Sequence, residues 1–315
     1  MKMIIQIPCF NEEGTLATVL AKLPRHISGI DKVEWMIIDD GCTDDTVRIA
    51  RENGVDHVVS HPHNLGLARA FMTGITSCLE LGADIIVNTD ADNQYDGECI
   101  PALVEPILND NAEMVIGCRP IDKIEHFSFS KKIFQKLGSF VVRLASQTDV
   151  LDAPSGFRAI SREAAMHLNV FSPYTYTLET IIQAGQEKLK IVSVPIKVNE
   201  ELRPSRLVRS IPSYIYRSVL TILRVFITYN PLKFFLTIGL VLFLVGLFFN
   251  LRWVVLYFND PSRARVPSLI LGLTFITGSF FTMALAVIGD LLSVNRRLME
   301  EIRYRLLKKN RIDSA

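Results

Sequence analysis

Three carboxylates crowd into one short stretch of the chain. Residues 88–96 read NTDADNQYD and place Asp90, Asp92 and Asp96 among amide side chains, directly after the apolar run ADIIV. Like charges at this spacing repel, and each raises the pKa of its neighbours. The crowding is physically reasonable if a cation binds between the acids. The segment therefore predicts a cation site at the end of a buried strand.

The residue types near these acids narrow the choice of cation. Zinc prefers His and Cys ligands, and none flank Asp90. A calcium site of the EF-hand type needs a longer loop with a glycine at its sixth position, and this segment does not have that pattern. Mg²⁺ or Mn²⁺ remains, because such ions take a few carboxylates and share their other positions with substrate phosphates. The separate histidines His57, His61 and His63 leave open both a polar loop and a second metal site.

The acids follow strands of an expected α/β fold. Across residues 1–120, β-branched apolar runs alternate with helical patterns, which is typical of a largely parallel sheet. Ligands of such sheets bind beyond the carboxyl ends of the strands, where Asp39, Asp40, Asp90 and Asp92 are expected. The chain has no GxxxxGK[ST] motif, and no GxGxxG motif follows the first strand, so a P-loop enzyme and a dehydrogenase are disfavoured.

Two C-terminal segments are long enough to cross a membrane. Residues 232–258 are apolar apart from Asn250 and Arg252, and residues 266–289 contain no charged side chain. A hydrocarbon core of about 30 Å takes roughly 20 helical residues. Two membrane-spanning helices are therefore expected, and two buried helices of a soluble core are the alternative.

The charges of the chain predict its orientation. Residues 1–200 carry 18 Lys and Arg against 27 Asp and Glu, whereas residues 201–315 carry 16 against 6. Basic residues flank both spans, but the connection at 259–265 has only Arg263 and Arg265. The positive-inside rule then places both large flanks in the cytoplasm and the connection outside. The five cysteines agree as reduced cytosolic thiols, and the N-terminal apolar run is too short for a signal peptide.

The sequence predicts four parts. They are a cytoplasmic catalytic domain at 1–205, an interfacial amphipathic helix at 206–231, a two-helix anchor at 232–292 and a basic cytoplasmic tail at 293–315. The interfacial helix has Ser210 as its N-cap, a thin basic stripe on a broad apolar face, and a break at Asn230-Pro231. The alternative is an ordinary amphipathic helix packed on the catalytic domain. The expected location is the inner or cytoplasmic membrane, as a multi-pass protein.

Four motifs in order resemble those of glycosyltransferase family 2, whose members have the GT-A fold. They read IPCFNEE, IIDDGCTDDT, HNLGLARA and NTDADNQYD, and the likeness covers about residues 1–205. It is strongest to the dolichol-phosphate mannose synthase and bacterial polyprenyl-phosphate glycosyltransferase group, whose membrane-anchored members also have C-terminal spans. A processive synthase of the cellulose or hyaluronan type would show a QxxRW motif and more spans, and this chain shows neither.

The resemblance implies a metal ion, Mg²⁺ or Mn²⁺, on the diphosphate of a UDP- or GDP-sugar. Asp90, Asp92 and Gln94 would hold the metal, and Asp92 would be catalytic. A structural role is implied for Asp39, and hydrogen bonds to the nucleotide base for Asp40. The residues expected around the nucleotide are Pro8, Asn11, Glu12, Glu13, Asp40, Asn64, Gly66, Arg69 and Asp90.

The acceptor implied by the resemblance is a polyprenyl phosphate, which is already anionic and needs no strong base. Arg158, Arg203 and Arg206 are expected to bind its charge, and Arg203 and Arg206 serve equally well as topology-setting charges. Some bacterial members have an acid, a proposed base, where this chain has Gly156. Transfer to a lipid hydroxyl would need a base, and for that reaction Asp152 is the catalytic candidate, as the only acid besides Asp149 in the same irregular loop.

The sequence therefore predicts a membrane-anchored, metal-dependent, inverting glycosyltransferase. It would transfer a hexose-type sugar from a nucleotide donor to a polyprenyl phosphate at the cytoplasmic membrane face. The alternatives are transfer to a lipid hydroxyl, such as that of a diacylglycerol, and a catalytically silent membrane scaffold on the same fold. The intact acids argue against a scaffold, because a silent copy has no reason to keep repelling carboxylates. No nucleic-acid partner is expected, and homo-oligomerisation is left open.

Overall fold

The computed structural model describes residues 1–120, 139, 142–143, 146–170, 176–199, 219–220, 223–224, 226–259 and 266–314. These residues form two compact units. One comprises Met1–Ile222 with Tyr304–Ala315, and the other comprises Leu223–Arg303. The first unit contains the acidic motifs, and the second contains most of the long apolar helices.

Within the described residues, the first unit is built on a sheet of seven strands in the order β3-β2-β1-β4-β6-β5-β7. All neighbouring strands are parallel except β6, which is antiparallel to β4 and β5. The expected α/β fold with a mostly parallel sheet is thereby confirmed. The strands are β1 (Lys2–Cys9), β2 (Lys32–Asp39), β3 (His57–Ser60), β4 (Ile85–Asn88), β5 (Met114–Cys118), β6 (Arg158–Ser161) and β7 (Ile191–Pro195).

The two long strands are buried on both faces. In β1 (KMIIQIPC) and β2 (KVEWMIID), every residue after the first lysine is buried. Successive side chains of a strand point to opposite faces, so continuous burial requires cover on both sides of the sheet. This is why these strands read as unbroken apolar runs rather than as alternating polar and apolar residues.

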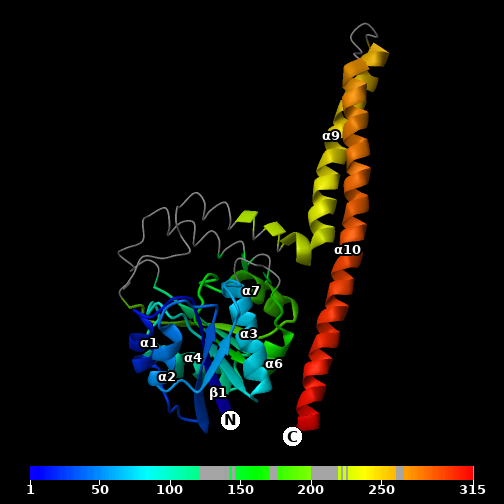
Figure 1. Ribbon diagram of the computed structural model, residues 1–315. Coiled ribbons are helices and arrows are strands. Elements are labelled where there is room, and N and C mark those ends of the chain that lie inside the picture. The colour runs from blue at the N-terminus through cyan, green and yellow to red at the C-terminus, as the bar shows by residue number, and fades with distance from the viewer. Residues whose placement is uncertain are drawn as a thin grey trace. The chain divides into compact units, whose positions relative to one another are not determined.

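Helices cover both faces of the sheet (Figure 1). On one face Met3, Ile5 and Ile7 of β1 pack in a core with side chains of α1 and α4. On the other face the amide of Gln6 donates to the carbonyl of Phe71 in α3. The helices of this unit are α1 (Leu16–Lys22), α2 (Thr46–Glu52), α3 (Leu67–Glu80), the 3-10 turn η1 (Gly97–Cys99), α4 (Ile100–Leu108), α6 (Arg162–His167) and α7 (Thr177–Gln186).

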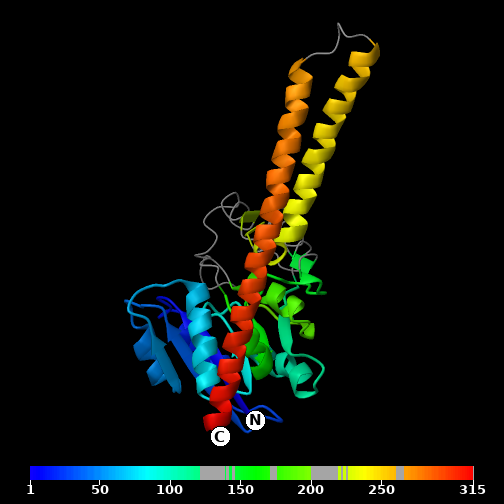
Figure 2. The same cartoon turned by 90° about the vertical axis from the view of Figure 1, so that its right-hand side faces the viewer.

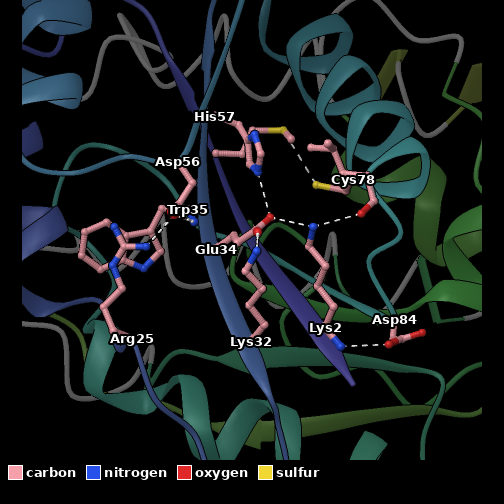
Figure 3. A network of polar contacts seen from close by, with 11 residues as sticks. Lys2, Arg25, Lys32, Glu34, Trp35, Asp56, His57, Cys78 and Asp84 are labelled. Carbon is pink, nitrogen blue, oxygen red and sulfur yellow. Dashed lines mark hydrogen bonds and ion pairs between the residues drawn. The ribbon is translucent and has the colours of Figure 1, made fainter.

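A network of polar contacts joins the amino ends of β1, β2 and β3 (Figure 3). The Glu34 carboxylate lies 2.7 Å from Lys2 Nζ, 2.6 Å from Lys32 Nζ and 2.8 Å from His57 Nε2. Burial acts to raise the pKa of the Glu34 carboxyl, but hydrogen bonds from these three residues outweigh it and lower the pKa to about 2. The network fixes the end of the sheet opposite to the acidic motifs.

The second unit contains α9 (Pro231–Asn259) and most of α10 (Val266–Ser314). Both helices are long and apolar enough to cross a membrane. Their most apolar 18-residue windows have mean hydropathies of 2.5 and 1.9, and only 11% and 17% of these windows are buried. A core helix of a soluble protein would be mostly buried, so this exposure favours membrane association. Residues 226–229 are helical, Asn230 is not, and α9 begins at Pro231, so the expected break at Asn230-Pro231 is confirmed.

Small residues let α9 and α10 approach closely, and the helices run side by side in both views (Figures 1 and 2). The Ser279 hydroxyl donates to the Gly239 carbonyl at 2.8 Å. A Cβ added to Gly246 would lie 2.8 Å from the carbonyl oxygen of Gly272. Close packing of this kind is how helices associate where the surroundings are as apolar as their own side chains.

The second long helix is longer than the sequence predicts. The expected anchor ends at residue 292, with a separate basic tail beyond it, but α10 continues to Ser314. Residues 290–309 contain no Gly or Pro and are rich in Leu, Arg, Lys and Glu, which favour helix. A change from apolar to charged side chains does not interrupt a helix when the backbone preference continues.

Candidate active site

The acidic loops meet at the carboxyl edge of the sheet. Cys9 pairs in register with Asp39, and Gln6 pairs with Asn88, so the loops after β2 and β4 start on either side of the end of β1. Because β6 is antiparallel, its first residue, Arg158, pairs with Asn88 at the end of β4. The segment that leads into β6 therefore joins the same edge.

Asp90 and Asp92 lie close enough for their charges to interact. Burial, and then the charge of Asp92, raises the pKa of the Asp90 carboxyl to about 7. Asp92 accepts a hydrogen bond from the backbone N–H of Gln94 at 3.0 Å. Asp96 instead caps η1 by accepting from the backbone N–H of Glu98 at 3.2 Å. Two of the three crowded carboxylates thus remain as a pair.

Gly156 lets the Asp90 carboxylate lie close against the backbone. A Cβ on Gly156 would lie 3.0 and 3.2 Å from the two carboxylate oxygens of Asp90 and 2.8 Å from the Tyr176 hydroxyl. The glycine is fixed in place, because its N–H donates to the Tyr95 hydroxyl at 2.9 Å and its carbonyl accepts from the Asn88 amide at 2.8 Å. The acid that some bacterial members have at this position would not fit here unless Asp90 moved.

The oxygen atoms at this edge suit Mg²⁺ or Mn²⁺. Asp90, Asp92 and the side-chain carbonyl of Gln94 offer the oxygen ligands that these hard cations prefer. Among the described residues, no three His, Cys, Asp or Glu side chains form a group that could hold a metal. The remaining ligands would have to come from a bound diphosphate. The interacting carboxylates of Asp90 and Asp92 fit such a cation, and Gln94 as a third ligand stays a prediction.

Asp152 is held in a buried ion pair. Its carboxylate accepts from Arg119 Nε at 2.7 Å, from Arg119 Nη2 at 3.0 Å and from the Arg119 backbone N–H at 3.2 Å. Asp152 is 0% exposed and Arg119 is 8% exposed. A carboxylate gripped by a guanidinium is a weak base, because a proton would have to displace the stronger charge-assisted bonds. This arrangement does not favour the expected role of Asp152 as a base.

Arg158 is buried completely. Its guanidinium donates to the carbonyls of Ser155 at 2.9 Å, Ala153 at 3.0 Å and Thr177 at 2.9 Å, and to the Thr180 hydroxyl. Burial lowers the pKa of Arg158 to about 10, so the side chain stays charged at neutral pH. Its donors are used inside the protein. Arg158 therefore holds the segment before β6, and this differs from the expected contact with an acceptor phosphate.

Asp40 holds the loop between β3 and α3. Its Oδ1 accepts from the backbone N–H of Leu65 at 2.8 Å, its Oδ2 accepts from Gly66 at 2.9 Å, and His61 Nδ1 lies 2.8 Å from Oδ1. Both carboxylate oxygens are thus engaged in a side chain that is 3% exposed. This differs from the expectation that Asp40 binds the nucleotide base.

Asp39 uses one carboxylate oxygen for the turn that follows it. Oδ1 accepts from the backbone N–H of Cys42 at 2.7 Å, and the Cys42 thiol also interacts with the Asp39 carboxylate. The turn requires a glycine, because Gly41 has φ +74° and a Cβ there would lie within 2.6 to 2.8 Å of the backbone of His63 and Asn64. The hydrogen bonds of Asp39 therefore support the turn after β2, and those of Asp40 hold the later loop.

The loop after β1 is tied to the loop after β2. The Asn11 side-chain carbonyl accepts from the backbone N–H of Thr43 at 2.8 Å, and the Glu13 carboxylate accepts from that of Asp45 at 3.0 Å. Asn11 adopts φ +55°, and Glu12 is 8% exposed. These residues shape the edge at which a nucleotide is expected.

The other expected nucleotide residues lie at the same edge of the sheet. Pro8 is buried near the end of β1, and Gly66 directly precedes α3. Asn64, in the loop before α3, and Arg69, in its first turn, are exposed, and Arg69 has no ion pair within the described residues. The two expected acceptor residues Arg203 and Arg206, and most of the expected interfacial helix, lie outside the described residues.

The histidines have separate partners rather than a shared metal. His57 contacts Glu34 at the amino ends of the strands, whereas His61 bridges Asp40 and the Thr73 hydroxyl, with 2.8 and 2.9 Å between the paired atoms. The described residues therefore give no support to a second metal site in the segment HVVSHPHN.

Two residues at this edge were not predicted from the sequence. Arg119 directly follows β5, and Nη1 of its side chain lies 3.5 Å from Oε1 of Gln94. Asn199, after β7, donates from its amide to the Asn93 carbonyl and from its backbone to the Gln94 carbonyl, both at 3.0 Å. The sequence could have pointed to Arg119, because a charged side chain directly after a predicted strand, here in the segment VIGCR, is expected at the carboxyl edge of the sheet.

Comparisons with known proteins match the whole motif region. The profile described as Glycosyl transferase family 2 matches residues 4–168. A UDP-N-acetylglucosamine–dolichyl-phosphate N-acetylglucosaminyltransferase of Methanococcus voltae is 33% identical over 215 residues, which are 61% of this chain and 83% of that protein. An undecaprenyl-phosphate mannosyltransferase of Micrococcus luteus is 28% identical over 219 residues, which are 66% and 88% of the two chains.

A solved structure shares the fold. Glucosyl-3-phosphoglycerate synthase from Mycobacterium tuberculosis, in complex with Mn²⁺, uridine diphosphate and glucosyl-3-phosphoglycerate, has a TM-score of 0.54 at 22% identity. The match covers 70% of this chain and 79% of that one. At this identity the likeness supports only the fold of the first unit, which is called the catalytic unit from here on.

Proposed function

Because the chain belongs to glycosyl transferase family 2 and is a glycosyltransferase, we propose that it transfers a sugar from a nucleotide-sugar donor to a polyprenyl phosphate. The names of its relatives support both substrates, since one uses UDP-N-acetylglucosamine and dolichyl phosphate and another acts on undecaprenyl phosphate. The two long apolar helices support a substrate that resides in a membrane.

The observation that carries the proposal is the pair Asp90 and Asp92 at the carboxyl edge of the sheet, with Gly156 packed closely against Asp90. A divalent cation bound there, Mg²⁺ or Mn²⁺, would stabilise the negative charge on the departing nucleoside diphosphate. The solved structure with the same fold contains Mn²⁺ and uridine diphosphate. Because both carboxylate oxygens of Asp40 are engaged by a later loop, Asp39 is the proposed contact of the nucleotide base.

The proposed reaction is a single displacement with inversion. An oxygen of the acceptor phosphate forms a bond to the anomeric carbon while the bond from that carbon to the diphosphate breaks on the opposite side. The phosphate is already anionic, so no residue has to remove a proton from it. This suits a site in which Asp152 is gripped by Arg119 and is no free base.

The acceptor phosphate still needs cationic partners. Arg158 is occupied inside the protein, so the proposal assigns this role to Arg203 and Arg206, in the basic segment that follows residue 200 in the sequence. Reversal of both charges, Arg203→Glu with Arg206→Glu, should raise the apparent KM for the lipid and leave donor binding nearly unchanged. Unaltered lipid kinetics would mean that these arginines only set topology.

The decisive experiment offers the purified full chain a panel of labelled UDP- and GDP-sugars with polyprenyl phosphate or diacylglycerol. We expect transfer to the phosphate, dependence on Mg²⁺ or Mn²⁺, and loss of transfer in Asp92→Asn. Transfer to diacylglycerol alone would identify a lipid hydroxyl as the acceptor. No transfer from any donor would favour the silent scaffold, and full activity of Asp92→Asn in excess chelator would exclude the metal site.

A further inference from the structure

We propose that Arg119 is a positioning residue for Gln94. Asp152 holds the guanidinium of Arg119 in place, and that guanidinium orients the Gln94 side chain for cation binding. This inference rests on the proposed function, because Gln94 matters only if a cation binds at Asp90 and Asp92. Neither Arg119 nor Asp152 would touch the cation. Their contribution would be to fix the carbonyl oxygen of a neighbouring amide before the cation and the diphosphate arrive.

The contacts form a chain from a rigid strand to the acidic loop. Asp152 takes Nε and Nη2 of Arg119 on its two carboxylate oxygens, at 2.7 and 3.0 Å, and also takes the Arg119 backbone N–H. The third nitrogen, Nη1, is thereby directed toward Gln94 Oε1 at 3.5 Å. A planar guanidinium fixed by two parallel bonds cannot turn its remaining donor freely. The direction of Nη1 is therefore set by Asp152.

The loop that carries Gln94 is supported from its other side by Asn199. The backbone N–H of Asn199 donates to the Gln94 carbonyl, and its amide donates to the Asn93 carbonyl, both at 3.0 Å. With the backbone fixed in this way, the orientation of the Gln94 side chain is the remaining freedom, and Arg119 contacts that side chain through Nη1. The side-chain amide of Gln94 could present either its oxygen or its nitrogen to Arg119. Because Arg119 is a donor, it favours the orientation that presents Oε1, the atom that a cation also needs.

The cost of burying this ion pair argues for a purpose beyond stability. Removing two charges from water is expensive, and a buried pair often contributes no more to stability than well-packed apolar side chains would. Groups behind a metal's direct ligands, in contrast, commonly change metal affinity by about 10-fold to 100-fold. The pair of Arg119 and Asp152 leaves Nη1 of Arg119 beside Gln94, the expected ligand. This placement suits an effect on metal affinity better than an effect on stability.

The test measures Mn²⁺ binding to the full-length protein in detergent, with UDP or GDP present, by electron paramagnetic resonance of free Mn²⁺. Arg119→Lys keeps the charge but loses the fork, so we expect Mn²⁺ affinity to fall by about 10-fold. In a Gln94→Ala background the same change should add almost nothing, because two residues that act through one contact are not additive. An equal 10-fold loss in both backgrounds would overturn the inference.

Asp152→Asn separates positioning from base catalysis. If Asp152 only holds Arg119, the variant should need more Mn²⁺, and its kcat should return toward the wild-type value at saturating Mn²⁺. A kcat that stays low at every Mn²⁺ concentration, with unchanged Mn²⁺ affinity, would make Asp152 a base and overturn the inference.

Glu34→Gln is the matched control for stability. It also removes a buried carboxylate from a cluster of cations, but at the opposite end of the strands (Figure 3). It should lower the Tm without changing Mn²⁺ affinity, and loss of affinity in this control would attribute the Arg119 effect to general loosening. A wild-type protein that binds no Mn²⁺ with UDP or GDP would overturn the proposed function and this inference with it. Normal wild-type binding with unaltered affinity in Arg119→Lys would overturn the inference alone.

Discussion

At the scale of single residues, the absence of a side chain at Gly156 matters as much as the presence of the acids. The two oxygens of Asp90 and the hydroxyl of Tyr176 all come within about 3.2 Å of where a Cβ would stand. Asn88 and Tyr95 hold the glycine backbone in place, so the site cannot relax by moving that segment alone. Even the addition of one methyl group at Gly156 should therefore displace Asp90.

Gly156→Ala tests this directly. The added methyl group must displace Asp90 or Tyr176, and overpacking of this kind costs about 1–3 kcal/mol. We expect a lower Tm and weaker Mn²⁺-dependent binding of the nucleotide, measured by thermal denaturation and by titration calorimetry. Gly14→Ala is the control, because a Cβ at Gly14 meets nothing within 4 Å. Equal behaviour of the two variants would show that the close packing of Gly156 against Asp90 is not needed.

The sequence located the acids but not their individual roles. Asp90 and Asp92 could be placed at the carboxyl edge because a buried strand precedes them. The functions of Asp39 and Asp40 could not be separated, because they depend on which carboxylate meets the N–H groups of Leu65 and Gly66 in a later loop.

Long-range pairing was also beyond the sequence. Arg119 and Asp152 stand 33 residues apart, and no local pattern announces that they pair. The burial of Arg158 had the same cause, since its partners come from two separate stretches of the chain, 153–155 and 177–180, and the identity of a charged residue alone suggests exposure instead.

At the scale of elements, the sheet is fastened at its amino ends by Glu34 and its cationic neighbours (Figure 3). The pKa of the Glu34 carboxyl is lowered from 4.5 to about 2 in the folded protein. A lowered folded-state pKa contributes stability that is complete above the unfolded pKa and is lost as the pH falls toward the folded one. The window in which this contribution disappears is therefore about pH 4.5 to pH 2.

Glu34→Gln should destabilise the catalytic unit by about 3 kcal/mol at pH 7, and the difference from wild type should shrink as the pH falls through that window. Urea unfolding followed by Trp35 fluorescence in a Trp253→Phe background measures it. Glu52→Gln, which affects an exposed pair with Arg48, is the control and should change stability little. A difference that is independent of pH would contradict the assignment of the effect to the Glu34 charge.

The hairpin of α9 and α10 depends on close backbone contact. In Gly246→Val the new side chain would begin 2.8 Å from both the Gly272 carbonyl and a side-chain carbon of Ile276, which should separate the helices at a cost of about 1–3 kcal/mol. Gly278→Val is the matched control, since its Cβ would meet nothing within 4 Å. Thermal inactivation in detergent should be faster for the first variant alone, and equal rates would argue against this packing.

At the scale of the whole molecule, an acidic catalytic unit is joined to an apolar and basic region. The excess of acids in residues 1–200 and of bases in residues 201–315 was evident from the sequence, and both long apolar helices were expected. The continuation of α10 to Ser314 was not expected, because the predicted span was bounded by hydropathy, whereas a helix is bounded by backbone preference. Hydropathy reports the surroundings of a helix rather than its length.

The charge distribution predicts topology. A reporter enzyme fused after Asn259 should be active only outside the cytoplasm, and one fused after Ala315 only inside, because basic residues flank both apolar helices on the cytoplasmic side. Fusions after Pro231 and after Asn295 should also report the cytoplasm. An outside signal at Ala315 would mean a single span or an inverted protein.

The antiparallel strand β6 has a consequence for the order of events during synthesis. It lies between β4 and β5 in the sheet, but it follows β5 in the chain and is separated from it by residues 119–157. Chains begin to fold from the end that leaves the ribosome first. Strands β1 to β4 can therefore pair as a four-stranded platform, while β5 waits for β6 to join it to the rest.

In this interval Asp90 and Asp92 are already attached to the platform but still face water, where their repulsion costs little. The arrival of β6 brings Arg158, Gly156 and the partner of Arg119 to the edge together. The nascent enzyme thus completes its donor-facing half early and encloses its acids last. A ribosome paused before residue 158 should display a chain with a formed platform and no affinity for Mn²⁺.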